Sequence, residues 1–416
     1  MKNGAAMKVV LINRSDSLGG AAVASARLMR AMRRSGIDAR MLVADKRGSD
    51  PNVALLGGPL ATKGCFLAER LGVFLRNGLN RDTLFKIDDA SWGLNAAAHP
   101  WVREADAIVL NWINQGTLSV AGIRRLAALR KPIVWVMHDM WNCTGVCHHA
   151  YDCRRYRQVC RACPLTGAKG TDLSTAVQRA KQRLYADVPI HFVAVSHWLA
   201  DCCRQSSLMR NASISVIANP IDAEKFEFGR RRDPDVCPAG PDAIVAAMGA
   251  ARLDDPVKGF DLLIAATRHI AAHNPQLAKR LHIMLYGTLR NQSLLDEIAV
   301  PHTYLGYRSD VNRIMQNADI VLSTSRYESF GYTLAEGLAS GCVPVTTGMG
   351  GQADIVKHRQ NGYVSGTLSP AGIAAGIEWA AGCGLDRAQQ HRYALNHFDG
   401  AAVAAQYSTL LSGLVK

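Results

Sequence analysis

Short apolar segments with strand character alternate with amphipathic helical segments along most of the chain, and this alternation restricts the possible folds more than any other feature. The expected strands of the first half are Val9–Asn13, Ala39–Ala44, Ala107–Leu110, Ile133–His138 and His191–Ser196. Helical patterns such as 21–34 and 123–129 separate them. Because parallel strands need long crossover connections, usually helices, this order predicts an α/β fold with a doubly wound parallel sheet and helices on both faces.

The pattern stops near Pro220 and restarts after a polar stretch, 224–242, that is rich in Arg, Pro and Gly and is typical of a linker or surface loop. The expected strands beyond it are Ala243–Met248, His282–Tyr286, Thr303–Leu305, Ile320–Ser323 and Val343–Thr347, with helices over 260–273 and 332–340. We therefore expect two Rossmann-like domains, residues 1–220 and 221–400, that face each other across a cleft. Residues 401–416 are expected to form a helix that packs back on the first domain.

Charge is distributed unevenly between the two halves. Residues 1–220 hold 30 Lys and Arg against 15 Asp and Glu, a net charge of +15, whereas residues 221–416 hold 18 against 19, a net charge of −1. This asymmetry indicates that the first half meets something anionic. Nucleic acid, an anionic membrane surface and a phosphorylated acceptor all fit, and a solvated surface without a partner is the alternative.

No apolar run reaches the ~20 residues of a membrane-spanning helix. The first residues lack the apolar stretch of a signal peptide and lead directly into the first expected strand. We therefore expect a cytoplasmic protein with reduced thiols, in which the eleven cysteines do not form a disulfide framework.

Two glutamates, Glu328 and Glu336, lie eight residues apart around a predicted strand-to-helix turn. Gly331 allows close backbone approach there, and the start of the helix near Tyr332 favours a phosphate group. Glu336 is placed to accept ribose hydroxyls and Glu328 to accept sugar hydroxyls. On spacing alone, two surface glutamates around an ordinary turn are the favoured interpretation.

Arg252 and Lys258 follow the first strand of the second domain and are expected in the loop at its carboxyl end. Open parallel sheets bind ligands at that edge. Two fixed cations there would stabilise the charge of a departing diphosphate, so that no catalytic metal is required. Two solvated basic residues are the alternative, which loses weight because the glutamates are expected on the same rim.

Together these motifs resemble glycosyltransferase family 4 of the GT-B fold. The resemblance rests on the following segments: Arg252 with Lys258-Gly259, Ala318-Asp319-Ile320 to Ser323, Glu328-x-Phe330-Gly331-x4-Glu336, Gly341-x-x-Pro344-Val345, Gly350-Gly351 and Asn361-Gly362. The hinge signature of the family is present with changes, because Ala218 replaces its first Pro and Pro220 replaces its Gly.

The resemblance implies a retaining transferase that uses a nucleotide-diphosphate sugar. It implies a donor-binding set of Gly19, Gly20, Arg252, Lys258, Phe330, Gly331, Tyr332, Thr333 and Glu336. It also implies that His138 contacts the donor sugar, so that the catalytic set is His138, Arg252, Lys258 and Glu328. In the route proposed for the family, the acceptor hydroxyl attacks from the side of the leaving group, and the departing phosphate oxygen takes its proton.

Four cysteines within seventeen residues form a separate motif, Cys147-x5-Cys153-x6-Cys160-x2-Cys163, in the loop 140–165. In a reducing compartment this spacing predicts a structural Zn²⁺ site that holds a long polar loop. Cys143, His148 and His149 are alternative ligands, an iron–sulfur cluster is a second possibility, and unconnected thiols are a third.

The segments Asn111–Gly116 and Trp135–His148, with the later cysteines, resemble the colanic-acid branch of the family. That branch implies synthesis of bacterial surface polysaccharides, including exopolysaccharide and lipopolysaccharide. It also implies a UDP- or GDP-sugar and a saccharide or polyprenyl-diphosphate-linked acceptor.

Residues 63–79 combine six large apolar residues with Lys63, Arg70 and Arg76. Such a basic amphipathic stretch could lie on an anionic membrane surface, as in a peripheral membrane protein, and a core helix with a solvated basic face is an equal alternative. Asp233-Pro-Asp235 matches the metal-binding motif of another glycosyltransferase fold, but it lies in the linker and is interpreted as chance.

Two other functions fit parts of the sequence. A zinc-bearing nucleic-acid-binding protein would explain the charge and the cysteines, but the aromatic residues do not cluster with the basic ones. A sugar-nucleotide epimerase of the same fold would keep the domains and change the reaction. We expect the glycosyltransferase, without nucleic acid as a partner.

Overall fold

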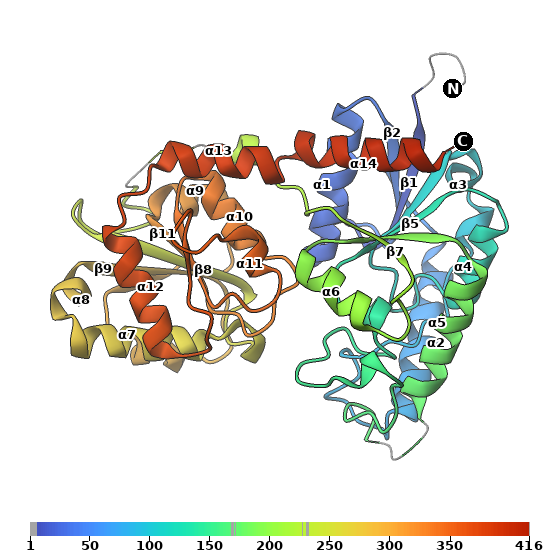
Figure 1. The fold of residues 1–416 in the computed structure, drawn as a ribbon, viewed down its shortest axis with the longest axis horizontal. Coiled ribbons are helices and arrows are strands. Elements are labelled where there is room, and N and C mark those ends of the chain that lie inside the picture. Colours follow the sequence, from blue (N-terminus) through green and yellow to red (C-terminus); the bar gives the residue numbers. More distant parts are fainter. Residues whose placement is uncertain (1–5, 168–169, 171, 227, 230–232, 416) are drawn as a thin grey trace. The chain divides into compact units, whose positions relative to one another are not determined.

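The computed structural model describes residues 6–167, 170, 172–226, 228–229 and 233–415. The chain divides into two compact units. Unit 1 consists of Met1–Pro220 and Val403–Lys416, and unit 2 of Ile221–Ala402. Each unit is an α/β layer structure with one parallel sheet (Figure 1).

Unit 1 contains a seven-stranded parallel sheet with the order β3-β2-β1-β4-β5-β6-β7. The strands are β1 (Lys8–Ser15), β2 (Asp38–Asp45), β3 (Val53–Leu55), β4 (Ala107–Leu110), β5 (Ile133–Met137), β6 (Ile190–Ala194) and β7 (Ser213–Val216). The five expected strands are confirmed, and β3 and β7 are additions. Both are edge strands of three or four residues, too short for a clear apolar pattern.

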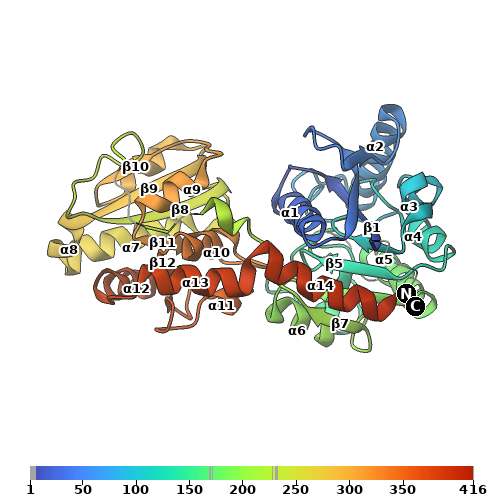
Figure 2. The ribbon, with the colours of Figure 1, turned by 90° about the horizontal axis from the view of Figure 1, so that it is seen from above.

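Helices cover both faces of this sheet, with α1 on one side and α4 and α5 on the other (Figures 1 and 2). The helices of this unit are α1 (Gly20–Arg34), α2 (Pro59–Arg76), α3 (Pro100–Glu104), α4 (Val120–Ala127), α5 (Leu173–Asp187) and α6 (His197–Gln205). The last helix, α14 (Gly400–Leu414), enters unit 1 at Val403. Its end lines a groove together with Pro132 and Ile190 at the amino edge of the sheet.

Unit 2 contains a six-stranded parallel sheet with the order β10-β9-β8-β11-β12-β13. The strands are β8 (Ile244–Arg252), β9 (Leu281–Thr288), β10 (His302–Tyr304), β11 (Ile320–Ser323), β12 (Val343–Thr346) and β13 (Tyr363–Val364). All five expected strands are confirmed. One boundary was wrong: β8 continues four residues beyond Met248, so Arg252 is the last residue of the strand and does not lie in the loop.

The helices of unit 2 form two layers, with α7 packed against α12 on one face and α9 and α13 packed against α10 on the other (Figure 1). They are α7 (Phe260–His273), α8 (Pro275–Arg280), α9 (Val311–Asn317), α10 (Tyr332–Ala339), α11 (Gln352–Ile355), α12 (Pro370–Gly382) and α13 (Arg387–Phe398). The core between the layers is aliphatic, and Leu263, Ile283 and Ile373 in it are fully buried.

Both sheets reverse their strand order once, between β1 and β4 in unit 1 and between β8 and β11 in unit 2. In open α/β sheets, ligands bind outside the carboxyl ends of the strands at this switch point. The expected site residues lie there. Gly19 and Gly20 follow β1, His138 follows β5, Arg252 ends β8, and Glu328 follows β11.

Among the described residues, no helix combines the length and the apolar character that a membrane crossing requires.

Candidate functional site

Lys258 and Glu328 form the central contact of the candidate site in unit 2. Lys258 ends the short 3-10 turn η5 (Pro256–Lys258) after β8, and Glu328 lies in the loop after β11. The Nζ atom of Lys258 donates to Oε2 of Glu328 at 2.7 Å. Burial alone would lower the pKa of Lys258, but the Glu328 carboxylate outweighs it and raises this pKa, so the amine stays charged at neutral pH.

Arg252, the last residue of β8, lies beside two carboxylates of the loop that follows this strand. Its Nη2 atom is 3.1 Å from Oδ2 of Asp255, and its Nε atom is 3.5 Å from Oδ1 of Asp254. The charge of Asp255 also acts on Lys258, so Asp255 lies between the two cations. The Arg252 side chain is 33% exposed, which leaves it accessible to an anionic ligand. We call Arg252, Asp255, Lys258, Glu328 and the start of α10 the Lys258 cluster.

Two glycines allow the backbones of this cluster to come close together. Gly259 has a φ of +66°, and a Cβ atom there would lie 2.1 Å from the carbonyl oxygen of Thr324, whose hydroxyl donates to Gly259 O at 2.8 Å. Gly350 has a φ of +82°, and a Cβ atom there would lie 2.1 Å from the carbonyl oxygen of Glu328. A side chain at either position would displace the backbone that carries Lys258 or Glu328.

The first turn of α10 follows the Glu328 loop. Gly331 precedes the helix with φ +113° and ψ +57°, a left-handed conformation that favours glycine. The amides of Leu334 and Ala335 donate to Gly331 O at 3.0 and 3.3 Å, so the earlier amides and the positive end of the helix dipole point toward the cluster. Phe330 is buried and packs edge-on against Tyr332, with ring centroids 5.2 Å apart.

Glu336 lies one turn into α10 and is 9% exposed. Its charge acts on Tyr286 of β9. Burial and this charge together raise the pKa of that tyrosine. The Tyr286 hydroxyl is hydrogen-bonded by Thr333, and its ring fills the space above Gly249, where a Cβ atom would be 1.9 Å away. The structure therefore brings Glu336 and Thr333 together at the ends of β8 and β9.

In unit 1, His138 follows β5 and contacts Asn111, which follows the neighbouring β4. The Nε2 atom of His138 lies 3.1 Å from Oδ1 of Asn111, and since an amide oxygen only accepts, Nε2 donates. The other ring nitrogen, Nδ1, is buried without a partner among the described residues and is an acceptor. Burial lowers the pKa of His138 to about 4 against the opposing effect of Asp139, so the imidazole is neutral at pH 7.

Asp139 is held by three donors. Its Oδ2 atom accepts from Nε1 of Trp112 and from Nδ1 of His148, both at 2.8 Å, and its Oδ1 accepts from the Trp141 amide at 2.8 Å. Burial disfavours the carboxylate, but the charge and the hydrogen bond of His148 prevail and lower the pKa of Asp139 to about 2. For His148 burial also opposes the charge, yet Asp139 raises its pKa. We call His138, Asn111, Trp112, Asp139 and His148 the His138 cluster.

The loop between β1 and α1 contains the two glycines expected at the donor. Gly19 has a φ of +92° and requires glycine for that reason, whereas Gly20 begins α1. A Cβ atom at either position would meet nothing within 4 Å. Asp16 fixes the start of the loop, because its carboxylate accepts from the amides of Arg47 and Gly48 at 3.0 and 2.8 Å.

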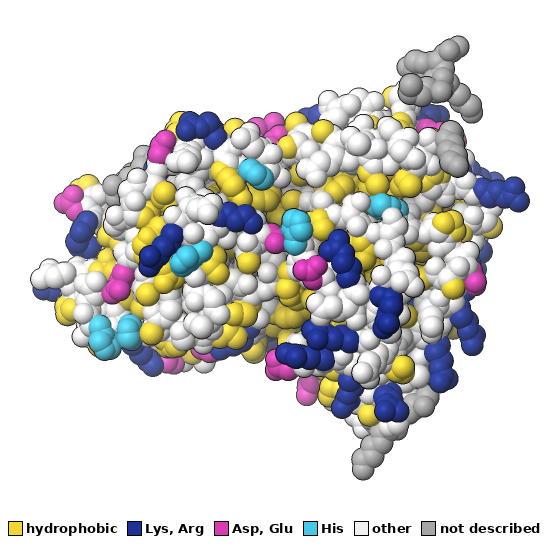
Figure 3. Space-filling model, viewed as in Figure 1, with side chains coloured by type: hydrophobic (Ala, Val, Ile, Leu, Met, Phe, Trp, Pro, Cys, Tyr) yellow, Lys and Arg dark blue, Asp and Glu magenta, His cyan; other side chains and the backbone are white. Residues whose placement is uncertain are grey.

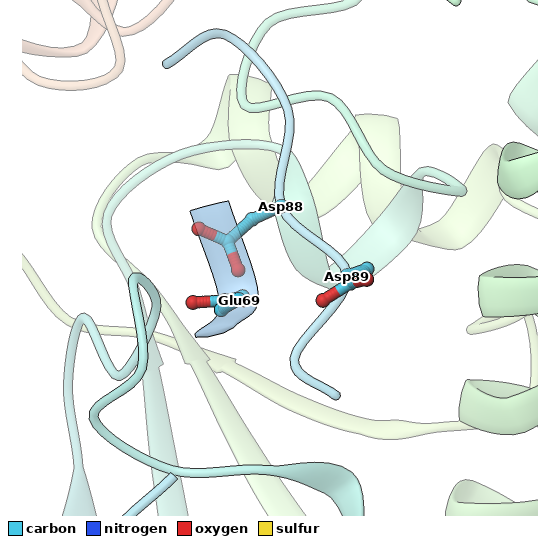
Figure 4. A group of neighbouring side chains, drawn as sticks. All are labelled: Glu69, Asp88 and Asp89. Atoms are coloured by element: carbon cyan, nitrogen blue, oxygen red, sulfur yellow. The ribbon is translucent and has the colours of Figure 1, made fainter. Parts of the chain in front are cut away.

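A buried acidic cluster consists of Glu69 in α2 and of Asp88 and Asp89 in the loop that follows α2 (Figure 4). Burial and the neighbouring Asp88 raise the pKa of Glu69, whereas the pKa of Asp88 is lowered because Glu69 and the charge of Arg70 outweigh its burial. Arg70 is 2.8 Å from Asp88 and only 5% exposed, and Arg76 contacts Asp89. The expectation that Arg70 faces a membrane was therefore wrong, because it neutralises an internal carboxylate.

Comparison with protein families decides what kind of protein this is. Residues 18–225 match Glycosyltransferase Family 4, and residues 244–397 match Glycosyl transferases group 1. The chain belongs to glycosyltransferase family 4. The first match lies in unit 1 apart from its last residues and the second lies in unit 2, so both clusters fall within matched segments.

Individual relatives of this glycosyltransferase are distant. An uncharacterised glycosyltransferase of Methanocaldococcus jannaschii is 31% identical over 128 residues, which are 29% of this chain and 32% of that protein. The glycogen synthase of Mycobacterium tuberculosis H37Rv is 29% identical over 172 residues, which are 40% of this chain and 39% of that protein. The chain thus matches between 32% and 39% of the length of these two curated relatives.

A solved structure supports the fold. The crystal structure of Anabaena HepE in complex with UDP and glucose has a TM-score of 0.61 and 18% identity, and covers 98% of this chain and 100% of that chain. At this identity the likeness shows the GT-B fold, with its two Rossmann-like domains, and the two parallel sheets described above agree with it.

Sequence reasoning missed two polar residues of the Lys258 cluster region. The Ser329 hydroxyl is buried and has no partner among the described residues. The Gln352 side chain is fully buried and binds the backbone of Ser325 and Met349 at 3.2 and 2.8 Å, which fixes the glycine-rich loop around Gly350. Only the position of Gln352 directly after two glycines could have indicated this role.

The linker motif Asp233-Pro-Asp235 of this glycosyltransferase has a structural explanation. Asp233 is 9% exposed, its carboxylate pairs with Arg313, and its amide donates to Oδ1 of Asn317 at 2.7 Å. Because Asn317 ends α9 shortly before β11, Asp233 lies near the amino end of that strand, away from the carboxyl ends where the expected site residues lie.

Proposed function

We propose that this chain is a retaining glycosyltransferase that moves a sugar from a UDP- or GDP-sugar to a saccharide acceptor. The observation that carries the proposal is the 2.7 Å contact of Lys258 with Glu328 beside the start of α10. A cation, a carboxylate that accepts hydroxyl hydrogen bonds, and a helix N-terminus are the groups that a nucleotide sugar requires. The crystal structures of Anabaena HepE with UDP and glucose and with UDP-glucose support this choice of ligand.

The two cations stabilise the leaving group. As the bond between the sugar and the diphosphate breaks, negative charge grows on the phosphate oxygens, and Lys258 and Arg252 are held by Glu328 and Asp255 where they can balance it. Two fixed cations and a helix start supply what a metal ion would supply elsewhere, so we expect transfer that is independent of a divalent metal. The Zn²⁺ predicted for the cysteine loop is structural in this proposal and takes no part in the reaction.

The remaining groups position the substrates. Glu336 accepts the ribose hydroxyls and Glu328 the sugar hydroxyls, while Nδ1 of the neutral His138 accepts from a donor-sugar hydroxyl. The Gly19-Gly20 turn adjoins the donor. The acceptor hydroxyl attacks from the side of the leaving group, and the departing phosphate oxygen takes its proton. Configuration at the sugar carbon is thereby retained without a protein nucleophile.

Binding of nucleotides to the whole protein tests this proposal directly. Thermal unfolding is followed with UDP, GDP and their sugars, because a ligand at 100 times its Kd stabilises the folded state by about 2.7 kcal/mol. We expect one nucleotide and its sugar to raise Tm, and Lys258→Ala to abolish the shift. The anomer of the product, followed by NMR, then tests retention, and addition of EDTA tests metal independence.

Other results would support the alternatives. Salt-sensitive binding of RNA without any nucleotide shift would favour the nucleic-acid-binding function. Conversion of the sugar nucleotide in the absence of an acceptor would favour the epimerase.

We further propose that the acceptor is lipid-linked, as in the bacterial surface polysaccharide branch, and that α2 holds unit 1 on an anionic membrane. Four leucines on one face of α2 form the α2 leucine face: Leu60, Leu67, Leu71 and Leu75, each 53–88% exposed. Their spacing of seven, four and four residues places them in one stripe. Lys63 lies beside this face on the same helix. Figure 3 shows other Lys and Arg side chains on the surface of unit 1.

Vesicle binding decides between a membrane and the alternative of a protein partner. We expect the chain to co-sediment with vesicles of anionic lipid at low salt, not with neutral vesicles, and to be released by salt. Leu67→Ser with Leu71→Ser should weaken binding, whereas Leu368→Ser, an exposed leucine of unit 2, should not. Equal binding of both variants, or a change of oligomeric state in the first, would exclude the membrane role of this face.

A further inference from the structure

The four cysteines of the predicted motif line one small cavity in unit 1. Cys147, Cys153, Cys160 and Cys163 all contribute to its wall, and its volume is about 20 Å³. This space holds one water-sized occupant. All four thiols are free, so the chain brings them together without disulfide bonds. Four cysteines that line one such space fit a metal site.

Backbone amides point at two of the four sulfurs. The Gly145 amide donates to Sγ of Cys160 at 3.3 Å. The backbone amide of Leu165 is directed at the sulfur of Cys163. The Thr144 hydroxyl donates to the carbonyl oxygen of Cys147 at 2.6 Å and so holds the backbone of that residue. Donors of this kind stabilise a sulfur that carries negative charge, as a metal-bound thiolate does.

Positive side chains surround the same cavity. Lys181 of α5 is fully buried, and its Nζ atom donates to the carbonyl oxygens of Trp141 and Thr144. Among the described residues no carboxylate forms an ion pair with it. Arg155 and Arg161 also line the cavity. Arg155 and Arg161 are exposed and Lys181 is buried close by, and these positive side chains would stabilise an anionic centre in the cavity.

We propose that Cys147, Cys153, Cys160 and Cys163 bind one structural Zn²⁺ ion. On binding, the four thiols release four protons to the solvent as four Zn–S bonds form, and the centre has a formal charge of −2 that Lys181, Arg155 and Arg161 balance. A sulfur-only ligand set favours zinc or an iron–sulfur cluster. We choose the single ion because the cavity that the four cysteines line is small, and an iron measurement tests the cluster.

The other candidate ligands are engaged elsewhere. The thiol of Cys143 donates to Met140 O at 3.2 Å, and Nδ1 of His148 contacts Asp139 at 2.8 Å. Neither these two residues nor the third alternative, His149, lines the cavity. The ligand set is therefore the four cysteines alone.

Zinc must draw the sulfurs closer together. Among the described residues, no three of these sulfurs lie within 4.8 Å of one another. A tetrahedral site with Zn–S bonds of about 2.3 Å places its sulfurs roughly 3.8 Å apart. Metal binding thus contracts the loop 140–165 around the ion, and the chain between the cysteines, which contains only the short turn η3 (Arg155–Arg157), allows this.

The proposed ion would also support the His138 cluster. Cys147 directly precedes His148, whose ring holds Asp139, and Asp139 directly follows His138. Lys181 of α5 donates to the carbonyl oxygen of Trp141 in the same loop, and the amide of Trp141 donates to Asp139. Loss of zinc should therefore destabilise unit 1 and, if the chain is a transferase, lower its rate through this positioning.

Metal analysis of the purified full-length protein tests the proposal. We expect about one zinc per chain, and release of zinc in step with modification of four thiols by a mercurial reagent in the presence of a metal-sensitive dye. The variants Cys160→Ser and Cys163→Ser should lose the metal and unfold at a lower temperature. The matched control Cys383→Ser, a partly exposed cysteine of unit 2, should keep it.

Cobalt substitution identifies the ligands. A protein produced with Co²⁺ should show the strong near-ultraviolet thiolate charge-transfer band and the red absorption of a tetrahedral centre, and both should be absent from Cys160→Ser. The titration of the unaltered protein keeps the test valid if the serine variants fail to fold. Less than ~0.3 zinc per chain, stoichiometric iron, or pairing of the four thiols as disulfides would overturn the site. A normal nucleotide-induced Tm shift in a zinc-free protein would leave the transferase proposal intact.

Discussion

The two units share one strand order but carry different chemistry at their switch points. In unit 2 the Lys258 cluster is charged. Asp255, three residues along the chain, pairs with Arg252, and Glu328 of the loop after β11 pairs with Lys258. In unit 1 the His138 cluster presents a neutral imidazole, and its charged pair of Asp139 and His148 is buried behind that ring. In the proposed reaction, unit 2 therefore stabilises the developing charge, whereas unit 1 contributes an uncharged group that orients the substrate.

Removing the cations of unit 2 gives the largest expected effect. Lys258→Ala and Arg252→Ala should each lower kcat by about 10²-fold or more, because each removes a fixed charge next to the leaving group. Lys279→Ala, an exposed lysine of α8 in the same unit, is the control and should keep normal turnover. Initial rates with saturating sugar nucleotide measure the effect. Near-normal rates in both variants would remove the Lys258 cluster from the mechanism.

A pair of glycine substitutions compares the two units at the level of the backbone. Gly350→Ala should lower the free energy of unfolding by about 2 kcal/mol or more, because φ is +82° and the new Cβ would lie 2.1 Å from Glu328 O. Gly20→Ala should change it by less than ~0.5 kcal/mol, because its Cβ meets nothing within 4 Å.

The two variants are compared by urea unfolding and by the KM for the sugar nucleotide. Gly20→Ala should raise KM despite its normal stability if the substrate approaches the start of α1 closely. If KM stays unchanged, the Gly19-Gly20 turn has no contact with the donor, and the difference between the units is larger than proposed.

Much of this fold was predictable because buried parallel strands are continuous apolar runs. All ten expected strands are present, whereas the short edge strands β3, β7 and β13 lack enough residues for a pattern. Strand order was not predictable from local pattern, since it depends on long-range pairing. The contact of Lys258 with Glu328 spans seventy residues and exists only because β8 and β11 are neighbours.

The helix α2 shows where local pattern fails. Composition suggested that its basic residues lie on the surface, but Arg70 points inward to Asp88 and leucines point outward. An internal carboxylate eighteen residues further along the chain determines this orientation, and no periodicity within the helix records it. The charge partner of His148, Asp139, was likewise not visible in the local pattern.

The smallest expected effect concerns the pH dependence of stability in unit 1, which should separate the two histidines of the His138 cluster. The folded-state pKa of His138 is about 4, below the value of about 6.5 in the unfolded chain, so the unfolded chain binds more protons between these values. His138 thus costs no stability above pH ~6.5 and an increasing amount as the pH falls toward 4. His148 has a raised pKa, so its contribution is fully present below pH ~6.5 and is lost as the pH rises through the folded value.

Opposite signs make the test sharp. Between pH ~7.5 and ~5.5, His138→Gln should reduce the acid-induced loss of unfolding free energy by on the order of 1 kcal/mol, and His148→Gln should increase that loss. His273→Gln, an exposed histidine of unit 2, is the control and should follow the unaltered protein. Urea unfolding at the two pH values measures the difference. If the acid-induced loss of unfolding free energy changes in the same direction in both cluster variants, the assignment of a neutral His138 next to a charged Asp139–His148 pair is wrong. The contrast between a charged cluster in unit 2 and an uncharged imidazole in unit 1 would then be wrong as well.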